Sequence, residues 1–306
     1  MDYILTSDNI SKQYKHVKAV DSVSLHVPKG SIYGFIGRNG AGKTTTLKIL
    51  SGLARPTSGD FSVFGCSGEE LRKQNMFSRI GILIENPGLY LDMSAYDNLR
   101  MKCLYAGIKD KNYIYDLLSL VGLGNVGRRA TKNFSLGMKQ RLGIAIALIG
   151  NPEILFLDEP INGLDPQGIA EIRETIVRLN KEKGLTIVIS SHILEELSKI
   201  ATDYGIINNG KLIAELTAEE LSSQCESRIV FKFADVQSAC GRLSEMGITR
   251  FKVIDPVTVH VYEKLEQIAQ IGMALAKSDI LISGMWIESA GIEEFFFNMT
   301  GGVHNA

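Results

Sequence analysis

One segment of the chain has the glycines, the lysine and the threonines of a phosphate-binding loop. It follows an apolar run that predicts a strand, and a helical pattern extends over residues 43–53. Glycines let successive backbone N–H groups turn towards phosphate oxygens, and the helix adds its positive amino-terminal end. Lys43 supplies a positive charge to the β- and γ-phosphates, and the Thr44 hydroxyl suits Mg²⁺. The segment therefore predicts that a nucleoside triphosphate and Mg²⁺ bind at Gly37, Arg38, Asn39, Gly40, Ala41, Gly42, Lys43, Thr44 and Thr45.

Two adjacent acidic residues follow another apolar run, at residues 154–157, and have the chemistry for phosphoryl transfer. Successive side chains of a strand point in different directions, so Asp158 and Glu159 can hold separate roles. We expect Asp158 to hold Mg²⁺, directly or through water, and Glu159 to polarise the water that attacks the γ-phosphate. The alternative is an exposed strand end without chemistry. The phosphate-binding loop upstream favours the catalytic interpretation.

A histidine, His192, follows a third apolar run at residues 186–190. Its imidazole can donate a hydrogen bond to a γ-phosphate oxygen. A lone histidine is usually structural. This one, however, follows a predicted strand, and the carboxyl ends of parallel strands meet at one edge of a sheet. We therefore expect His192 to lie near Lys43 and Glu159 and to take part in catalysis.

These residues require strands that end side by side. The chain begins with β-rich runs at residues 17–27 and 31–36. Further strand-like runs at residues 80–84, 154–157 and 186–190 are separated by helical stretches. This alternation predicts an α/β fold with a largely parallel sheet covered on both faces. Between residues 94 and 150 no strand is predicted, and residues 95–106, 113–121 and 136–149 have helical length and spacing, which indicates a helical insertion in the α/β core.

The last part of the chain has a different order of elements. After about residue 220 the pattern is strand, helix, strand, strand, helix, strand, which fits a small α+β ferredoxin-like unit. A final helix is predicted over residues 292–299, and its apolar spacing favours packing onto its own domain. We therefore expect two domains, residues 1–220 and residues 221–306.

Composition and charge exclude several classes of protein. The 306 residues include 33 Lys and Arg against 34 Asp and Glu, a formal net charge of −1, which argues against a nucleic-acid partner. The longest strongly apolar stretch, residues 142–149, is too short to cross a membrane, and the N-terminus lacks the pattern of a secretory signal. The four cysteines include no C-x-x-C pair, so we expect reduced thiols in the cytoplasm.

A further motif lies upstream of Asp158 and has the sequence Ser135-Leu136-Gly137-Met138-Lys139-Gln140-Arg141. Together with the loop and the carboxylates, it makes residues 1–220 resemble the ATPases of ATP-binding cassette (ABC) transporters. The resemblance implies a P-loop NTPase (RecA-like) core, an antiparallel β subdomain and a helical signature subdomain. It also implies ATP and Mg²⁺ as cofactors. Two copies of the chain would enclose two ATP molecules, each between the P-loop of one copy and the signature motif of the other.

The same resemblance implies roles for individual residues. Tyr14 would stack on adenine, and His192 would be the switch histidine. A helix that begins in the signature motif has free N–H groups that can bind a γ-phosphate. The residues that would contact nucleotide across the interface are Ser135, Gly137, Met138 and, in the D-loop, Asp165. An ordinary strand-end aromatic for Tyr14 and a simple helix cap for Ser135 are the alternatives.

Three positions depart from the usual family pattern. Leu136 stands where the first signature glycine is common, and Met138 stands where a glutamine is common. Glu85 replaces the glutamine that links Mg²⁺ to the membrane partner, and an ionised glutamate only accepts hydrogen bonds. We expect Glu85 to be a third metal ligand, beside Thr44 and Asp158, and to make nucleotide binding and coupling more dependent on Mg²⁺. The alternative for Glu85 is an exposed loop acid.

The motifs resemble most the ATPases of bacitracin-type and lantibiotic-immunity exporters. This resemblance implies ATP hydrolysis that powers separate integral-membrane permease subunits, which handle a peptide antibiotic. The chain would then bind the cytoplasmic face of the bacterial membrane through its permease. The alternatives are a soluble ABC ATPase not coupled to transport and a P-loop GTPase or kinase. The first typically has two cassettes or a coiled-coil insertion, and the GTPase has an Asn-Lys-x-Asp segment, which this sequence lacks.

Overall fold

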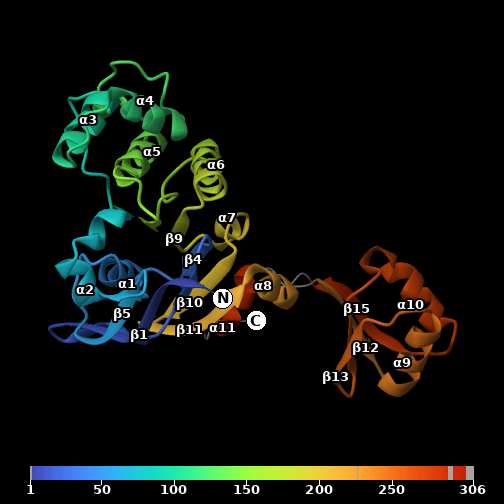
Figure 1. Cartoon of the computed structure of the whole chain (residues 1–306). Helices are drawn as coiled ribbons and strands as arrows, with labels where there is room; N and C mark the ends of the chain where they lie inside the picture. The colour runs from blue at the N-terminus through green and yellow to red at the C-terminus, as the bar shows by residue number, and fades with distance from the viewer. Residues whose placement is uncertain (1, 226, 289–291, 301–306) are drawn as a thin grey trace. The chain divides into compact units, whose positions relative to one another are not determined.

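The protein is described by a computed structural model that covers residues 2–225, 227–288 and 292–300. The chain forms two compact units, residues 1–218 and residues 219–306 (Figure 1). The first unit contains a six-stranded sheet, a five-stranded sheet and a group of helices. Every residue for which the sequence predicts chemistry lies in this first unit.

The six-stranded sheet supports the predicted phosphate-binding loop. Its strands lie in the order β11-β10-β4-β9-β8-β7, and neighbouring strands are parallel except for β10 and β11. All residues of β4, β8 and β9 are buried, as is typical of parallel strands covered on both faces. The strands are β4 Ile32–Ile36, β7 Ile80–Leu83, β8 Ile154–Asp158, β9 Thr186–Ser191, β10 Asp203–Asn208 and β11 Lys211–Thr217.

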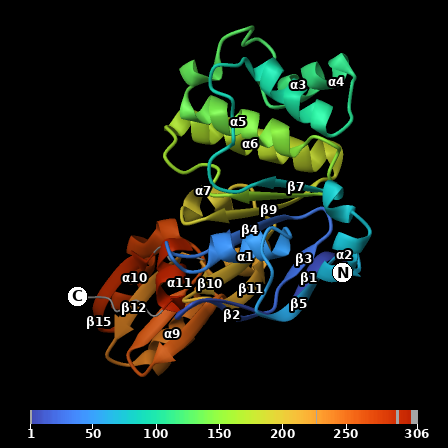
Figure 2. The same cartoon turned by 90° about the vertical axis from the view of Figure 1, so that its left-hand side faces the viewer.

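The five-stranded sheet is antiparallel and is formed mainly by the start of the chain. Its order is β2-β1-β5-β6, and β3 also pairs with β1. Helix α1 contacts both β2 and β8, and it therefore lies between the two sheets (Figure 2). The elements are β1 Tyr3–Tyr14, β2 Val17–Val23, β3 His26–Pro28, α1 Lys43–Leu50, β5 Ser58–Val63, β6 Cys66–Ser67 and α2 Gly68–Lys73.

The helical part of the first unit lies beyond β7 and β9. Helices α5 and α6 lie side by side, with α5 in contact with β7 and α6 in contact with β9 (Figure 2). Gly143 permits this approach, because a Cβ there would lie 2.7 Å from Pro87 Cβ and 3.0 Å from a methyl carbon of Leu83. The helices are α3 Ala95–Tyr105, α4 Lys111–Leu120, α5 Leu136–Ala147, α6 Pro166–Lys183 and α7 Leu194–Ser198.

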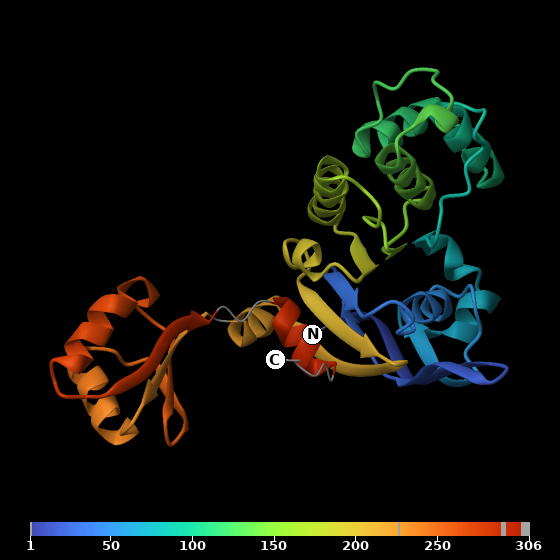
Figure 3. The ribbon, with the colours of Figure 1, turned by 180° about the vertical axis from the view of Figure 1, so that it is seen from behind.

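The second unit has the ferredoxin-like order that the sequence predicts. Its four strands form an antiparallel sheet in the order β13-β14-β12-β15, and α9 and α10 lie on one face of it (Figure 3). Phe231, Phe233, Val259 and Leu275 are fully buried between sheet and helices. The elements are α8 Ala218–Gln224, β12 Arg228–Phe233, α9 Val236–Glu245, β13 Phe251–Asp255, β14 Thr258–Val261, α10 Ile268–Ala276, β15 Ile282–Glu288 and α11 Ile292–Met299.

Candidate nucleotide site

The register of the parallel strands brings three loops to one edge of the sheet. Ile36 at the end of β4 pairs with Ser191, and Asp158 at the end of β8 pairs with Ser190. The first residue of the glycine loop, Gly37, donates its N–H to the Ser191 carbonyl at 3.4 Å. The segments that follow β4, β8 and β9 therefore start next to one another.

The glycine loop has a backbone conformation that residues with a side chain do not readily adopt. Gly40 and Gly42 have φ values of 81° and 107°, in the region that favours glycine. A Cβ on Gly42 would lie 2.5 Å from the Ala19 carbonyl oxygen, and one on Gly37 would lie 2.6 Å from that of Ile207. Gly42 is the N-cap of α1 and offers no side chain, so the first N–H groups of the helix face the loop directly. These are the features of an anion cradle.

Lys43 directs its ammonium group into this loop. The side chain is buried, and Nζ donates to the carbonyl oxygens of Gly37 at 2.7 Å and Arg38 at 3.3 Å. Nζ also lies 3.0 Å from Glu159 Oε1. The positive charge is thus fixed between the P-loop backbone and the second acidic residue of the sheet edge.

A chain of hydrogen bonds links α1, β8 and β9. The Thr44 hydroxyl donates to Asp158 Oδ2 at 2.7 Å, and the Ser190 hydroxyl donates to Asp158 Oδ1 at 2.6 Å. Ser190 is fully buried, and Asp158 is 7% exposed. Ser190 was not predicted as a site residue. It lies near the end of β9 and pairs with Asp158, so a prediction of which residues pair between β8 and β9 would have identified it.

The donor set at Thr44 and Asp158 fits a magnesium ion that also binds phosphates. A hydroxyl and a carboxylate are hard oxygen ligands, and Mg²⁺ is usually held by one or two carboxylates together with substrate phosphates and water. Within the described residues, no cluster of three or more His, Cys, Asp or Glu side chains forms a metal site. Thr44 and Asp158 together supply two oxygen ligands, which is part of a coordination shell and suits a metal that binds with a nucleotide.

Glu159 lies between a lysine and a histidine. Its backbone has φ 48°, in the left-handed region, and its N–H donates to the hydroxyl and carbonyl oxygens of Ser190 at 3.0 and 3.2 Å. Oε2 lies 2.8 Å from His192 Nδ1. Oε1 is buried and, among the described residues, receives no hydrogen bond. Lys43 Nζ lies 3.0 Å away and forms an ion pair with it, but the contact does not have the geometry of a hydrogen bond. This carboxylate oxygen can accept a hydrogen bond from a water molecule.

Glu85 binds a lysine of α1 in this structure. Its Oε1 accepts a hydrogen bond from Lys48 Nζ at 2.7 Å, and the Glu85 side chain is 66% exposed. The pairing lowers the pKa of the Glu85 carboxyl and raises the pKa of Lys48. Lys48 follows Thr44 by one helical turn, so Glu85 lies on the same side of α1 as the site. Its role as a metal ligand stays a prediction.

Tyr14 ends β1 beside the turn into β2, where it pairs with Val17. Its ring is half exposed, and Lys12 Nζ lies 5.2 Å from the ring centroid. Two residues after Val17 along β2, Ala19 lies against the glycine loop, since a Cβ on Gly42 would lie 2.5 Å from the Ala19 carbonyl oxygen. An exposed ring near the phosphate loop is suited to stacking on a base, and that role stays a prediction.

The signature and D-loop residues form a second group, at the starts of α5 and α6. Ser135 caps α5 by accepting the Met138 N–H at 3.2 Å, and Asp165 caps α6 by accepting the Gly168 N–H at 3.0 Å. Gly137 is buried, and a Cβ on it would lie 3.6 Å from Gly168 Cα. The two helix starts are therefore in contact. Within one copy this second group lies on the helices, whereas Lys43 and Asp158 lie at the sheet edge.

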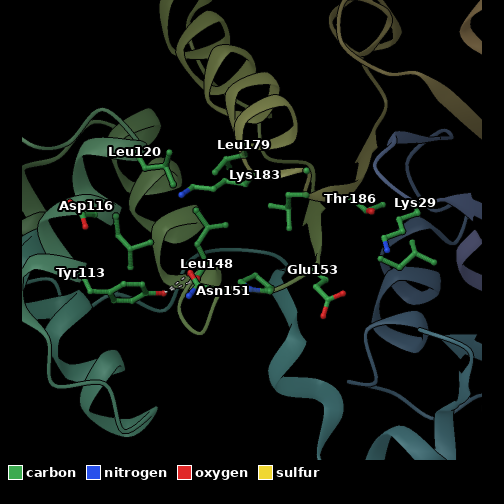
Figure 4. A pocket seen from close by; sticks show the side chains of 15 residues that line it. Lys29, Tyr113, Asp116, Leu120, Leu148, Asn151, Glu153, Leu179, Lys183 and Thr186 are labelled. Atoms are coloured by element: carbon green, nitrogen blue, oxygen red, sulfur yellow. Dashed lines mark hydrogen bonds between the residues drawn. The ribbon is translucent and has the colours of Figure 1, made fainter.

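A cavity of about 620 Å³ lies elsewhere in the first unit. Apolar side chains of α4 and α6 line it together with Lys29 and Thr186, as Figure 4 shows. Glu153 and Thr186 stand at the amino ends of β8 and β9, the opposite ends from Asp158 and Ser190. The cavity is therefore distinct from the predicted nucleotide site.

The fold and the sheet edge define the class of protein as a P-loop nucleoside triphosphatase. A family model described as ABC transporter matches residues 20–162. The bacitracin transport ATP-binding protein BcrA of Enterococcus faecalis is 39% identical over 303 residues, 99% of this chain and 98% of that protein. The lantibiotic transport ATP-binding protein SrtF of Streptococcus pyogenes is 45% identical over 232 residues, 75% of this chain and 99% of that protein.

A solved ATP-binding cassette of an ABC transporter, in its ADP conformation, has a TM-score of 0.65 and 25% identity to this chain. The match covers 72% of this chain and 93% of that one. The chain therefore belongs to the ATP-binding proteins of ABC transporters, and the predicted resemblance and fold class are confirmed. In the part of the chain that the structure describes, the helices are too short or too polar to span a membrane.

Proposed function

We propose that this protein hydrolyses ATP to drive a separate membrane permease that exports a peptide antibiotic. The observation that supports hydrolysis best is the group of Lys43, Asp158, Glu159 and His192 at one sheet edge. Lys43 Nζ and His192 Nδ1 lie 3.0 and 2.8 Å from the Glu159 carboxylate. Such a group combines a cation for phosphate, a base for water and a second proton donor.

The ion pair of Lys43 and Glu159 suggests how ATP would prepare the site. Phosphate oxygens would compete for the Lys43 ammonium, which now contacts Glu159. Glu159 would then be free to accept a hydrogen bond from water, while His192 keeps its carboxylate oriented through Oε2. The water oxygen would bond to the γ-phosphorus, the bond to the β-phosphate oxygen would break, and the water proton would pass to Glu159 and then to phosphate. Mg²⁺ bound through Thr44 and Asp158 would neutralise charge on the phosphates.

The position of the signature residues supports a dimer. Ser135, Gly137, Met138 and Asp165 lie at the starts of α5 and α6, where backbone N–H groups can bind an anion. In our proposal they complete the ATP site of a second copy, facing its P-loop and Tyr14. A chain with both half-sites would therefore bind two ATP molecules per dimer.

The relatives support the choice of cargo. One relative is a bacitracin transport protein and another is a lantibiotic transport protein, and both names describe ATP-binding subunits. A cassette of this kind has to act through permease subunits, so we place the protein at the cytoplasmic face of the bacterial membrane. Cargo specificity would reside in the permease, because the nucleotide site contacts only ATP and metal.

Two variants and one matched control test the catalytic proposal. Lys43→Ala should abolish ATP binding, whereas Glu159→Gln should retain binding and lower turnover by about 10²-fold or more. Glu153→Gln is the control, because Glu153 precedes β8 while Glu159 follows it. Sedimentation with ATP and Mg²⁺ should show a stable dimer for Glu159→Gln. Full turnover by that variant would exclude Glu159 as the base.

Expression with and without a multi-span permease, sought among the genes next to that of this protein, tests the transport proposal. Cells with both proteins should survive higher bacitracin or lantibiotic concentrations than cells that carry Lys43→Ala. Equal survival of the two strains with every peptide tested would contradict peptide export. It would leave ATP hydrolysis untouched.

A further inference from the structure

The turn that carries His192 lies between β9 and α7 (Figure 1). His192 directly follows Ser191, the last residue of β9, and α7 begins two residues later at Leu194. The imidazole contacts the Glu159 carboxylate, with Nδ1 2.8 Å from Oε2. The position of the imidazole therefore depends on what holds the strand and the helix on either side of the turn.

Helix α7 is too short to hold a fixed position by itself. It has five residues, and Ile193 at its N-cap makes no side-chain hydrogen bond. Isolated helices of this length are unstable, so tertiary contacts must fix it. Leu194 and Leu197 are buried, and a Cβ on Gly34 of β4 would lie 2.7 Å from a methyl carbon of Leu197. These apolar contacts hold α7 against the sheet.

The apolar contact between α7 and α6 is incomplete. A small cavity of about 10 Å³ lies between the two helices, and its lining includes Ile169 of α6, Leu197 of α7 and Ile200. Apolar packing is also non-directional. It therefore favours contact between α7 and α6 without fixing how far one slides along the other.

An ion pair joins the same two helices. Arg173 of α6 donates from Nη1 to Glu196 Oε2 of α7 at 2.7 Å. The two side chains are 29% and 20% exposed, so water screens the pair only in part. A charge-assisted hydrogen bond is short and directional. This contact fixes one point of α7 relative to α6.

Helix α6 is a firm support for that contact. It spans 18 residues, and Ile172, next to Arg173, is fully buried. Glu171 is bound to Arg141 of α5, with Oε2 2.8 Å from Nη2. A long helix that is held on two sides can fix the position of a short one.

We infer that Arg173 and Glu196 are positioning residues, which hold the turn after β9 so that His192 meets the Glu159 carboxylate. Glu196 follows His192 by only four residues, so a displacement of α7 along α6 would move the imidazole as well. The inference rests on the catalytic role proposed for His192.

Lys199 provides a matched control. It pairs with Oε1 of Glu196, three residues before it, at the end of the same helix. Lys199 and, to a smaller extent, Arg173 lower the pKa of the Glu196 carboxyl. Loss of Lys199 removes a cation from Glu196 but leaves α7 tied to α6. Loss of Arg173 breaks that tie, while Glu196 keeps a cation, so the variant should fold.

Steady-state ATPase kinetics of the full-length protein with Mg²⁺ test the inference. Arg173→Gln should lower kcat about tenfold and leave KM for ATP within about twofold, because a misplaced imidazole affects the reaction and not the phosphate-binding loop. Lys199→Gln should keep both values within about twofold. Arg173→Lys should retain most of kcat, since the contact uses a single nitrogen that a lysine can supply.

A double substitution separates positioning from a general effect on the fold. In a His192→Ala background, Arg173→Gln should cause no further loss of the residual kcat, because no imidazole is left to position. An effect on the fold would instead slow both backgrounds by the same factor.

A measurement on the nucleotide-free protein does not depend on turnover. The NMR signal of the His192 ring, identified by its loss in His192→Ala, reports the contact of Nδ1 with Glu159. Arg173→Gln should shift this signal, and Lys199→Gln should leave it in place. A wild type that does not hydrolyse ATP would contradict the proposed function, and the NMR comparison would still decide whether the ion pair positions His192.

Three results would overturn the inference. They are an Arg173→Gln protein with the kcat and the His192 signal of the wild type, an equal loss of kcat with and without His192, and an equal loss of kcat in Lys199→Gln. Full turnover by Glu159→Gln would instead count against the proposed function.

Discussion

Replacement of Ser190 by alanine is the most direct test of how this site is held. The hydroxyl of Ser190 donates to Asp158 Oδ1 at 2.6 Å and accepts the Glu159 N–H at 3.0 Å. In Ser190→Ala the Glu159 N–H keeps the Ser190 carbonyl at 3.2 Å, but Asp158 Oδ1 loses its donor. Asp158 is 7% exposed, so water compensates poorly for the loss.

The magnitude follows from the charge on Asp158. A hydrogen bond to a charged group contributes about 1.5–3 kcal/mol to stability. For a unit of 218 residues, each kcal/mol changes the melting temperature by about 2–4 °C. We therefore expect Ser190→Ala to lower the melting temperature of the first unit by about 3–12 °C, measured by calorimetry without nucleotide. It should also raise the Mg²⁺ concentration for half-maximal ATPase activity by about tenfold or more, because Asp158 loses orientation.

Ser191→Ala is the matched control. Ser191 is also fully buried, but its hydroxyl accepts the Ile193 N–H at 2.9 Å and donates to the Ile193 carbonyl at 3.4 Å. Bonds between neutral groups contribute about 1 kcal/mol, so the loss of stability should be smaller and the Mg²⁺ dependence unchanged. Equal melting temperatures for the two variants, with equal Mg²⁺ dependence, would refute the role given to Ser190.

Two further predictions concern Glu85 and Tyr33. Glu85→Gln should weaken the Mg²⁺ dependence of ATPase activity and transport, and no change in either would remove Glu85 from metal binding. Burial raises the pKa of Tyr33 well above its ordinary value of 10.0, and its hydroxyl donates to Glu215 at 2.7 Å. The unfolded chain ionises this tyrosine first, so stability should fall as pH rises above about 10. Urea unfolding should show a shallower alkaline loss for Tyr33→Phe, and identical slopes would contradict this reasoning.

The sequence correctly predicted the strands that precede Asp158 and His192. Residues 154–157 and 186–190 were expected as strands, and the structure has β8 Ile154–Asp158 and β9 Thr186–Ser191. Apolar runs bounded by turn-forming or polar residues have few alternative structures, and this is why the two strand predictions are confirmed. The final helix was predicted over residues 292–299, and α11 has those bounds.

The start of the chain was predicted less well. Residues 17–27 were expected as one β-rich run, but the structure divides them into β2 and β3, with Ser22 at φ 52°. The twelve-residue β1 was not predicted at all, because its buried residues do not alternate regularly and it pairs with three strands. The register shifts within β1 against β2 and β5, and the φ of 50° at Asn9, interrupt the two-residue period.

By itself, the sequence determined the loop from Gly37 to Thr45, the acids at the end of β8 and the order of strands and helices over residues 228–288. These depend on neighbours in the chain, which composition and spacing record. Only the tertiary structure decided that Ser190 supports Asp158 and that Glu85 binds Lys48. Such contacts join residues far apart in sequence, and they depend on strand order and side-chain direction, which no local pattern encodes.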